Sequence, residues 1–135
     1  MASTLKLNTL TGASTAGSIA VTGEGNSTTT NLQQGLCKAW VHHDQEGSHD
    51  IDDSFNMTSI ADSAVGRTTY TLTNNMANAT YPTPFQAWDS AKFLGYSQGF
   101  SKTTSSWGNA RTDAEASGSE IDADQVGETV FGDLA

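Results

Sequence analysis

Short runs in which apolar and polar residues alternate recur along this chain, and clusters of Gly, Asn and Ser separate them. This two-residue period is typical of β-strands that bury one face. In the clearest run, Ile51 to Met57, the apolar Ile51, Phe55 and Met57 share one face with Asp53. Thr is the most frequent residue, with 19 copies, and it suits a half-exposed pleated surface. Because helical periodicity is nearly absent, we predict an all-β fold.

The positions of these runs also favour a particular architecture. Further strands are expected at residues 36–42, 67–73, 85–88, 92–96 and 126–131, with a long loop at 97–119. The segment Tyr81–Pro84 is expected at a sheet edge or in a loop, because proline donates no ladder hydrogen bond. Short strands at this spacing favour a β-sandwich, jelly-roll-like in type.

The chain divides by pattern into two parts. Residues 1–30 predict a two-strand β arm with a turn at residues 12–17, and residues 31–135 predict the β-sandwich domain. An isolated hairpin with so small an apolar face is marginal in water. We therefore expect the arm to serve in oligomerisation or attachment. Its apolar residues are Leu5, Leu7, Leu10, Ile19 and Val21.

Charge and apolar content restrict the partners. The formal net charge is −9 and only six residues are Lys or Arg, which argues against binding to nucleic acid or to an anionic membrane surface. Leu, Ile, Val and Phe together make up only 22 of 135 residues. A chain this poor in large apolar side chains is expected to bury surface against neighbouring subunits.

We expect neither a signal peptide nor a membrane-spanning segment in this chain. Residues 1–25 lack the basic and apolar regions of a signal peptide, and no apolar run approaches the length that crosses a bilayer. We expect the protein to remain in the cytoplasm in which it is made. The single Cys37 excludes an internal disulfide.

The sequence around residues 42–53 is dense in His, Asp and Glu. Its spacing matches neither an EF-hand loop nor the HExxH zinc motif. The simpler interpretation is a solvated hairpin tip, and we predict no bound metal. If an ion did bind there, the ligands would come from His49, Asp50, Asp52 and Asp53.

Signals for catalysis are equally weak. Residues 95–99 (GYSQG) have the GxSxG spacing, but no helical pattern follows them as a nucleophile elbow requires, and Cys37 has no base beside it in sequence. A pair of catalytic carboxylates would need a deep cleft, which a small core does not supply. We therefore expect a protein that is not an enzyme and uses no cofactor.

Aromatic residues supply the remaining signal. We expect Trp40 and Trp88 to pack in the core. Trp107 lies in a stretch rich in Ser, Thr and Gly, so it is the aromatic most expected at the surface, either as a local packing anchor or as an interface or ligand contact. Together with Tyr96 and Phe100 it forms a candidate contact for a glycan ligand.

Several strings resemble those of tail-fibre-like and other virion-surface proteins of tailed phages, in particular phages of marine cyanobacteria. They are LKLNTLTG and SIAVTGEG in the arm, NLQQGLCKAW at 31–40, DSFN at 53–56, LTNNM at 72–76 and FGDLA at 131–135. Together they touch most of the chain.

This resemblance implies a structural protein of the virion that forms an oligomer, a trimer, and has no catalytic residues. Its partners would be copies of itself and other capsid or tail proteins. It would be assembled in the host cytoplasm as part of a tail fibre, a head fibre or a capsid decoration. An alternative, from a different class, is a module of a tail fibre that recognises a host surface glycan.

Overall fold

The protein is described by a computed structural model that covers residues 4–13, 19–23, 28–90, 94–113 and 119–135. For residues 94–100 and 111–113 it describes the backbone alone. The chain separates into two compact units, Met1–Leu36 and Cys37–Ala135. The sequence pattern had placed this division between residues 30 and 31.

The first unit contains a short antiparallel ribbon and a single helical turn. Strand β1 (Ala20–Thr22) pairs with β2 (Thr29–Asn31), and α1 (Leu32–Gly35) follows directly. The Asn31 side chain caps the turn by accepting the Gln33 N–H at 2.8 Å. None of the described residues of this unit is buried.

The expected pairing within the arm is wrong. Residues 4–13 form no strand, and Val21 pairs instead with Thr30, in a segment that the sequence indicated as a polar linker. Closing the short connection between β1 and β2 costs less conformational entropy than reaching back to residues 5–10. Thr-rich residues 28–30 also have the β propensity that a strand requires.

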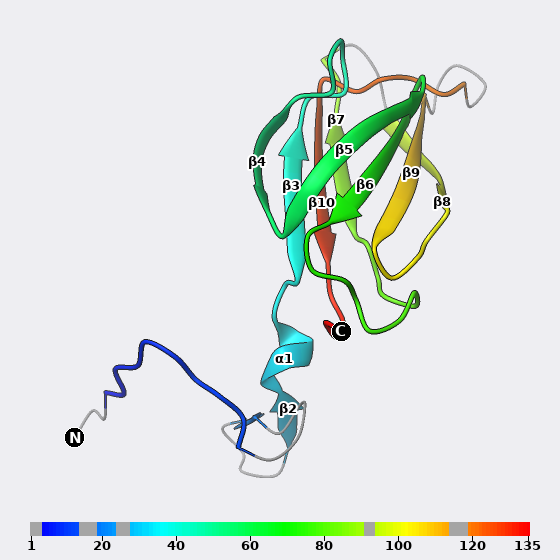
Figure 1. The fold of residues 1–135 in the computed structure, drawn as a ribbon. Helices are drawn as coiled ribbons and strands as arrows, with labels where there is room; N and C mark the ends of the chain where they lie inside the picture. The colour runs from blue at the N-terminus through cyan, green and yellow to red at the C-terminus, as the bar shows by residue number, and fades with distance from the viewer. Residues whose placement is uncertain (1–3, 14–18, 24–27, 91–93, 114–118) are drawn as a thin grey trace. The chain divides into compact units, whose positions relative to one another are not determined.

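The second unit is built from two antiparallel sheets of four strands each in its described residues (Figure 1). One sheet has the order β4-β3-β10-β7, with β4 at Ile51–Phe55, β3 at Ala39–His43, β10 at Gln125–Val130 and β7 at Phe85–Trp88. The other has the order β5-β6-β9-β8, with β5 at Met57–Ala64, β6 at Arg67–Leu72, β9 at Ser106–Asp113 and β8 at Leu94–Phe100. The predicted all-β, sandwich-like fold is confirmed.

The predicted positions of individual strands and loops were correct in some places and wrong in others. The run from Ile51 to Met57 does not form one strand, because Asn56 has a positive φ of 59° and separates β4 from β5. The long loop expected at residues 97–119 is wrong, since the end of β8 and all of β9 lie there. The prolines precede the edge strand β7, where the carbonyls of Pro82 and Pro84 accept hydrogen bonds from the N–H groups of Phe131 and Thr129.

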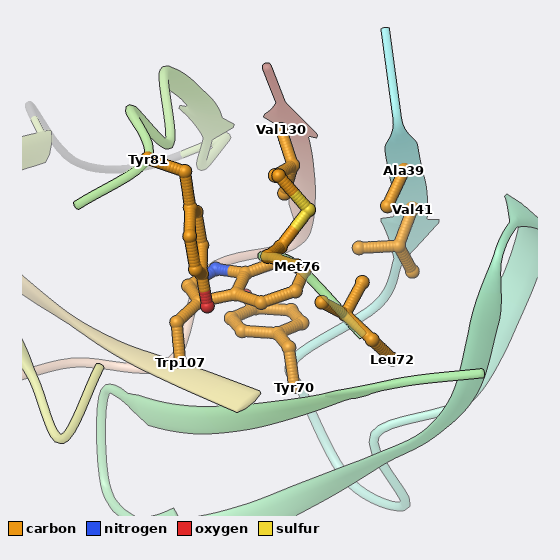
Figure 2. Packing of buried hydrophobic residues seen from close by; sticks show 8 residues of the cluster. All are labelled: Ala39, Val41, Tyr70, Leu72, Met76, Tyr81, Trp107 and Val130. Atoms are coloured by element: carbon orange, nitrogen blue, oxygen red, sulfur yellow. The ribbon is translucent and has the colours of Figure 1, made fainter. Parts of the chain in front are cut away.

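The core lies between the two sheets and is organised around aromatic rings (Figure 2). The rings of Tyr70 and Trp107 stack with their centroids 4.9 Å apart, and Tyr81 meets Trp107 edge to face at 6.4 Å. The remaining members of the buried cluster are Ala39, Val41, Leu72, Met76 and Val130.

The three tryptophans are distributed differently from expectation. Trp107 is 0% exposed, so its expected position in a surface loop is wrong. Trp88, expected in the core, is 55% exposed, and Trp40 is only partly buried. The alternation along β3 explains Trp40: Ala39, Val41 and His43 face inward, which turns the residue between Ala39 and Val41 outward.

Polar side chains also join the two sheets inside the sandwich. The Asn109 amide on β9 donates to the buried carboxylate of Glu128 on β10, with 2.7 Å to each oxygen. His43 Nε2 lies 3.0 Å from the Tyr70 hydroxyl, which joins β3 to β6. The Gln45 amide donates to Thr68 on β6 and accepts the backbone N–H of Ala123. These contacts satisfy polar groups that would otherwise be costly to bury.

Replacing Trp107 tests the importance of the central stack. Trp107→Ala should lower the free energy of unfolding by about 3–5 kcal/mol, because it leaves a cavity beside Tyr70 and Tyr81. Trp88→Ala is the matched control, and its solvent-exposed site should limit the loss to about 0.5 kcal/mol. Urea denaturation of the variants measures both values. Equal losses at the two positions would contradict this account of the core.

A second prediction concerns the buried phenol of Tyr81, whose hydroxyl donates to the carbonyls of Thr103 and Ser106. Burial raises the pKa of Tyr81 to about 12. The folded chain therefore holds this proton more tightly than the unfolded chain, in which the pKa is about 10. This contribution to stability should be complete below pH of about 10 and should decline as the pH rises toward about 12.

Ultraviolet absorbance titrations of the native protein and of Tyr81→Phe measure this ionisation. The difference between the two curves isolates Tyr81 from the other two tyrosines. A difference curve with its midpoint near the ordinary tyrosine pKa would contradict the prediction.

Candidate functional site

The outer face of the β4-β3-β10-β7 sheet carries a shallow groove over the middle of β10. Two adjoining cavities form it, with volumes of about 450 Å³ and about 180 Å³, and both are lined by His42, Gln86 and Gly127. We name this surface the Gly127 groove. Its defining residues are Trp40, His42, Gln86, Trp88, Gly127 and Thr129.

Strand register explains why the groove lies there. Gly127 pairs with His42 on β3 and with Gln86 on β7, so these three residues form one row across the sheet. Their neighbours Val126 and Glu128 are buried, which places the row on the outer face. Gly127 has no side chain to fill the centre of the row. A Cβ built there would find only the Gln86 carbonyl oxygen, at 4.0 Å.

Aromatic side chains flank this central row on both sides. Trp40 lies opposite Thr129 in one adjacent row, which continues to the exposed Phe55 on β4. Trp88 lies opposite Gln125 in the other. The groove therefore has an aromatic ring near each end and a gap in its middle.

The polar groups of the groove are mostly neutral. His42 Nδ1 lies 2.9 Å from Asp52, which fixes the imidazole orientation, and Gln86 contributes an exposed amide. The Thr129 hydroxyl donates to the Pro84 carbonyl at 3.2 Å. Within the described part of the chain, no Lys or Arg side chain lines either cavity. This arrangement can hold an uncharged ligand that has both apolar faces and hydroxyl groups.

The four candidate metal ligands do not come together. Asp52 pairs with His42, the Asp53 carboxylate accepts the Ser54 N–H, and Asp50 accepts the Ser48 hydroxyl. Within the described residues no group of three or more His, Cys, Asp or Glu side chains is placed to hold an ion. Asp53 is exposed, although alternation had placed it on an inward face.

His49, the fourth candidate, points into the protein. Its backbone has a positive φ of 53°, and its ring is buried and stacked on His43 with 6.1 Å between centroids. Its Nε2 lies 3.9 Å from Asp62 on β5, and neither ring nitrogen makes a hydrogen bond in the described part of the chain. The turn after Gly47 therefore separates His49 from the three aspartates.

The candidate glycan contacts are also not assembled as expected. Trp107 is enclosed by the core, so a ligand would have to open the sandwich to reach it. The side chains of Tyr96 and Phe100 lie outside the described part of the structure. The low apolar content of residues 97–119 concealed β9, whose inward positions include Trp107 and Asn109.

The candidate attachment residues are largely accessible to solvent. Leu5 is 81% exposed, and Leu7, Leu10 and Val21 are each more than half exposed. Ile19 is partly buried. These residues lie in or beside segments without a core of their own, so their apolar surfaces remain available for contact.

Two side chains that could have suggested catalysis, Glu128 and Cys37, make hydrogen bonds within the fold. The carboxylate of Glu128 is held inside the sandwich by Asn109, away from the groove that its strand lines. The Cys37 thiol, half-buried, donates to the Ala39 carbonyl at 3.0 Å.

Sequence reasoning did not identify the Gly127 groove. One signal was present: Gly127 lies inside the strand segment QVGETV, and glycine inside a strand often marks a site where another group approaches the backbone. The flanking positions could not be inferred, because β3, β7 and β10 are far apart in the sequence.

Comparison with known proteins found no match among protein-family models, curated proteins or solved structures. The resemblance to virion-surface proteins therefore stays a prediction. Among the described residues, no helix is both long enough and apolar enough to cross a membrane.

Proposed function

We propose that this chain is a non-enzymatic structural protein that assembles into a trimer through its first unit, Met1–Leu36. The observation that carries the proposal is that this unit has no buried residue among those described, whereas its leucines are exposed. A ribbon of two three-residue strands, together with one helical turn, is too small to be stable alone in water. Packing against copies of itself supplies the missing burial.

The energetics favour association through these side chains. Fully burying a leucine or valine side chain contributes about 1.5–3 kcal/mol. Leu5, Leu7, Leu10 and Val21 occur in every copy, so a closed symmetric assembly multiplies this gain. The ribbon edges of neighbouring chains would also be covered.

We further propose that the assembly belongs to the surface of a tailed-phage particle, next to capsid or tail proteins. The sequence strings described above support this placement, and so does the acidic composition. A net charge of −9 keeps a protein soluble at high copy number. The protein would be assembled in the host cytoplasm and exposed when the particle is released.

Replacing the exposed leucines tests self-association. A triple variant with Leu5→Ser, Leu7→Ser and Leu10→Ser should shift the mass measured by light scattering from three 14.2 kDa chains toward one. Val65→Ser is the matched control, because Val65 is 60% exposed in the second unit and should leave the mass unchanged. A native protein that is monomeric, or a triple variant that stays trimeric, would refute the proposal.

Placement on the particle has its own test. In a phage that encodes this chain, deletion of residues 1–30 should leave the protein absent from purified particles while the remaining unit is still produced. Immunoblotting of particles and lysate measures both. Particles that incorporate the truncated chain at the normal level would show that the first unit is not the attachment element.

A further inference from the structure

The Gly127 groove combines features that do not depend on the proposed attachment role of the first unit. It lies entirely on the second unit, and its three central positions are contributed by β3, β10 and β7. Its larger cavity, about 450 Å³, falls within the range of small-ligand sites. We propose that this groove binds a neutral saccharide.

The aromatic side chains suggest what kind of ligand fits. Trp88 is 55% exposed at one end of the groove, and the partly exposed Trp40 lines the other cavity. A single exposed ring is ordinary on a protein surface, but here Trp40, Trp88 and the exposed Phe55 gather on one face of the same sheet around a depression. Apolar surface gathered in this way marks a candidate ligand-binding groove. The face of an indole ring packs against the C–H groups of a sugar ring, which are apolar and weakly positive.

The polar groups between these rings match sugar hydroxyls. His42 presents an imidazole whose Nδ1 is held by Asp52, which leaves its other ring nitrogen for an external partner. Gln86 offers an amide that can both donate and accept. A hydroxyl group also does both, so one ligand can satisfy both side chains at once.

The charged groups around the Gly127 groove favour a neutral ligand. Among the residues whose side chains the structure describes, no Lys or Arg lines the cavities, and Asp52 lies at hydrogen-bonding distance from His42. An anionic ligand such as a sulfated or sialylated glycan would meet this carboxylate, and the whole chain carries a net charge of −9. The groove therefore favours uncharged hexose units over acidic ones.

Gly127 explains how a ligand reaches the sheet surface. A side chain at position 127 would project between His42 and Gln86, which lie beside Gly127 in the same row. The space there is open, since a Cβ at Gly127 would have no neighbour closer than 4.0 Å. The glycine thus keeps open the space that one sugar ring would occupy. A second copy of the chain would require a broad, continuous apolar face, whereas the centre of this surface is recessed and polar.

Nuclear magnetic resonance of the full chain provides a direct test. The protein has three tryptophans, and hence three indole N–H signals. Addition of neutral oligosaccharides of glucose, galactose and mannose should shift the signals of Trp40 and Trp88 and leave that of the buried Trp107 in place. Sialyllactose and a sulfated oligosaccharide, tested at the same concentration, should produce smaller shifts.

Two groove variants and one control locate the site. Gly127→Leu fills the groove, and Trp88→Ala removes one stacking face; each should weaken binding by about tenfold or more. Gly35→Leu is the matched control, because Gly35 also has open space around its Cβ position but lies in the first unit. It should bind as the native protein does. Thermal melts of all three establish that the chains remain folded.

Several results would overturn the proposal. The proposal fails if the native protein binds none of the neutral oligosaccharides at millimolar concentration, or if it binds the acidic probes more tightly. Binding that survives both Gly127→Leu and Trp88→Ala would place the ligand elsewhere. A lower mass for Gly127→Leu in light scattering would identify the groove as a contact between copies of the chain. Each result is independent of the leucine variants that test assembly.

Discussion

The stack of Tyr70 on Trp107 is the contact around which the two sheets of this sandwich are organised. Both rings come from the β5-β6-β9-β8 sheet, and the small residues Ala39, Val41 and Val130 pack against them from the other sheet. Because so few large aliphatic residues are available, aromatic area replaces aliphatic volume at the centre of the core. The rest of the interior is completed by side chains that hydrogen-bond across the gap.

Those polar contacts help to specify how the strands of the two sheets are aligned. Glu128 with Asn109 and His43 with Tyr70 connect one sheet to the other, and Gln45, just after β3, binds Thr68 on β6. A buried carboxylate or amide is tolerated only where its partner is correctly placed, so a slip of one residue in either sheet would break these contacts. The polar contacts thus restrict the register that the short, Thr-rich strands would otherwise specify weakly.

The same register creates the Gly127 groove. With Val126, Glu128 and Val130 committed to the interior, Gly127 and Thr129 must face outward, and they lie opposite His42 and Trp40. The groove is therefore a consequence of how β10 fills the core. The first unit differs, because none of its described residues is buried and Leu5, Leu7 and Leu10 are exposed. The proposed saccharide groove and the proposed assembly surface thus lie on separate units of the chain.

The sequence by itself determined the all-β class, the strand at Phe85–Trp88 and the strand at Arg67–Leu72, expected one residue longer, because alternation and proline act over a few neighbouring residues. It could not determine which tryptophans are buried. Trp107 follows a polar stretch yet lies at the centre of the core, whereas Trp88 sits in a clear strand yet faces solvent. Alternation shows that two faces differ, but which face meets the other sheet depends on strand pairings between distant segments. Only the tertiary structure, by placing β10 between β3 and β7, decided that the gap at Gly127 would lie between the partly exposed Trp40 and the exposed Trp88.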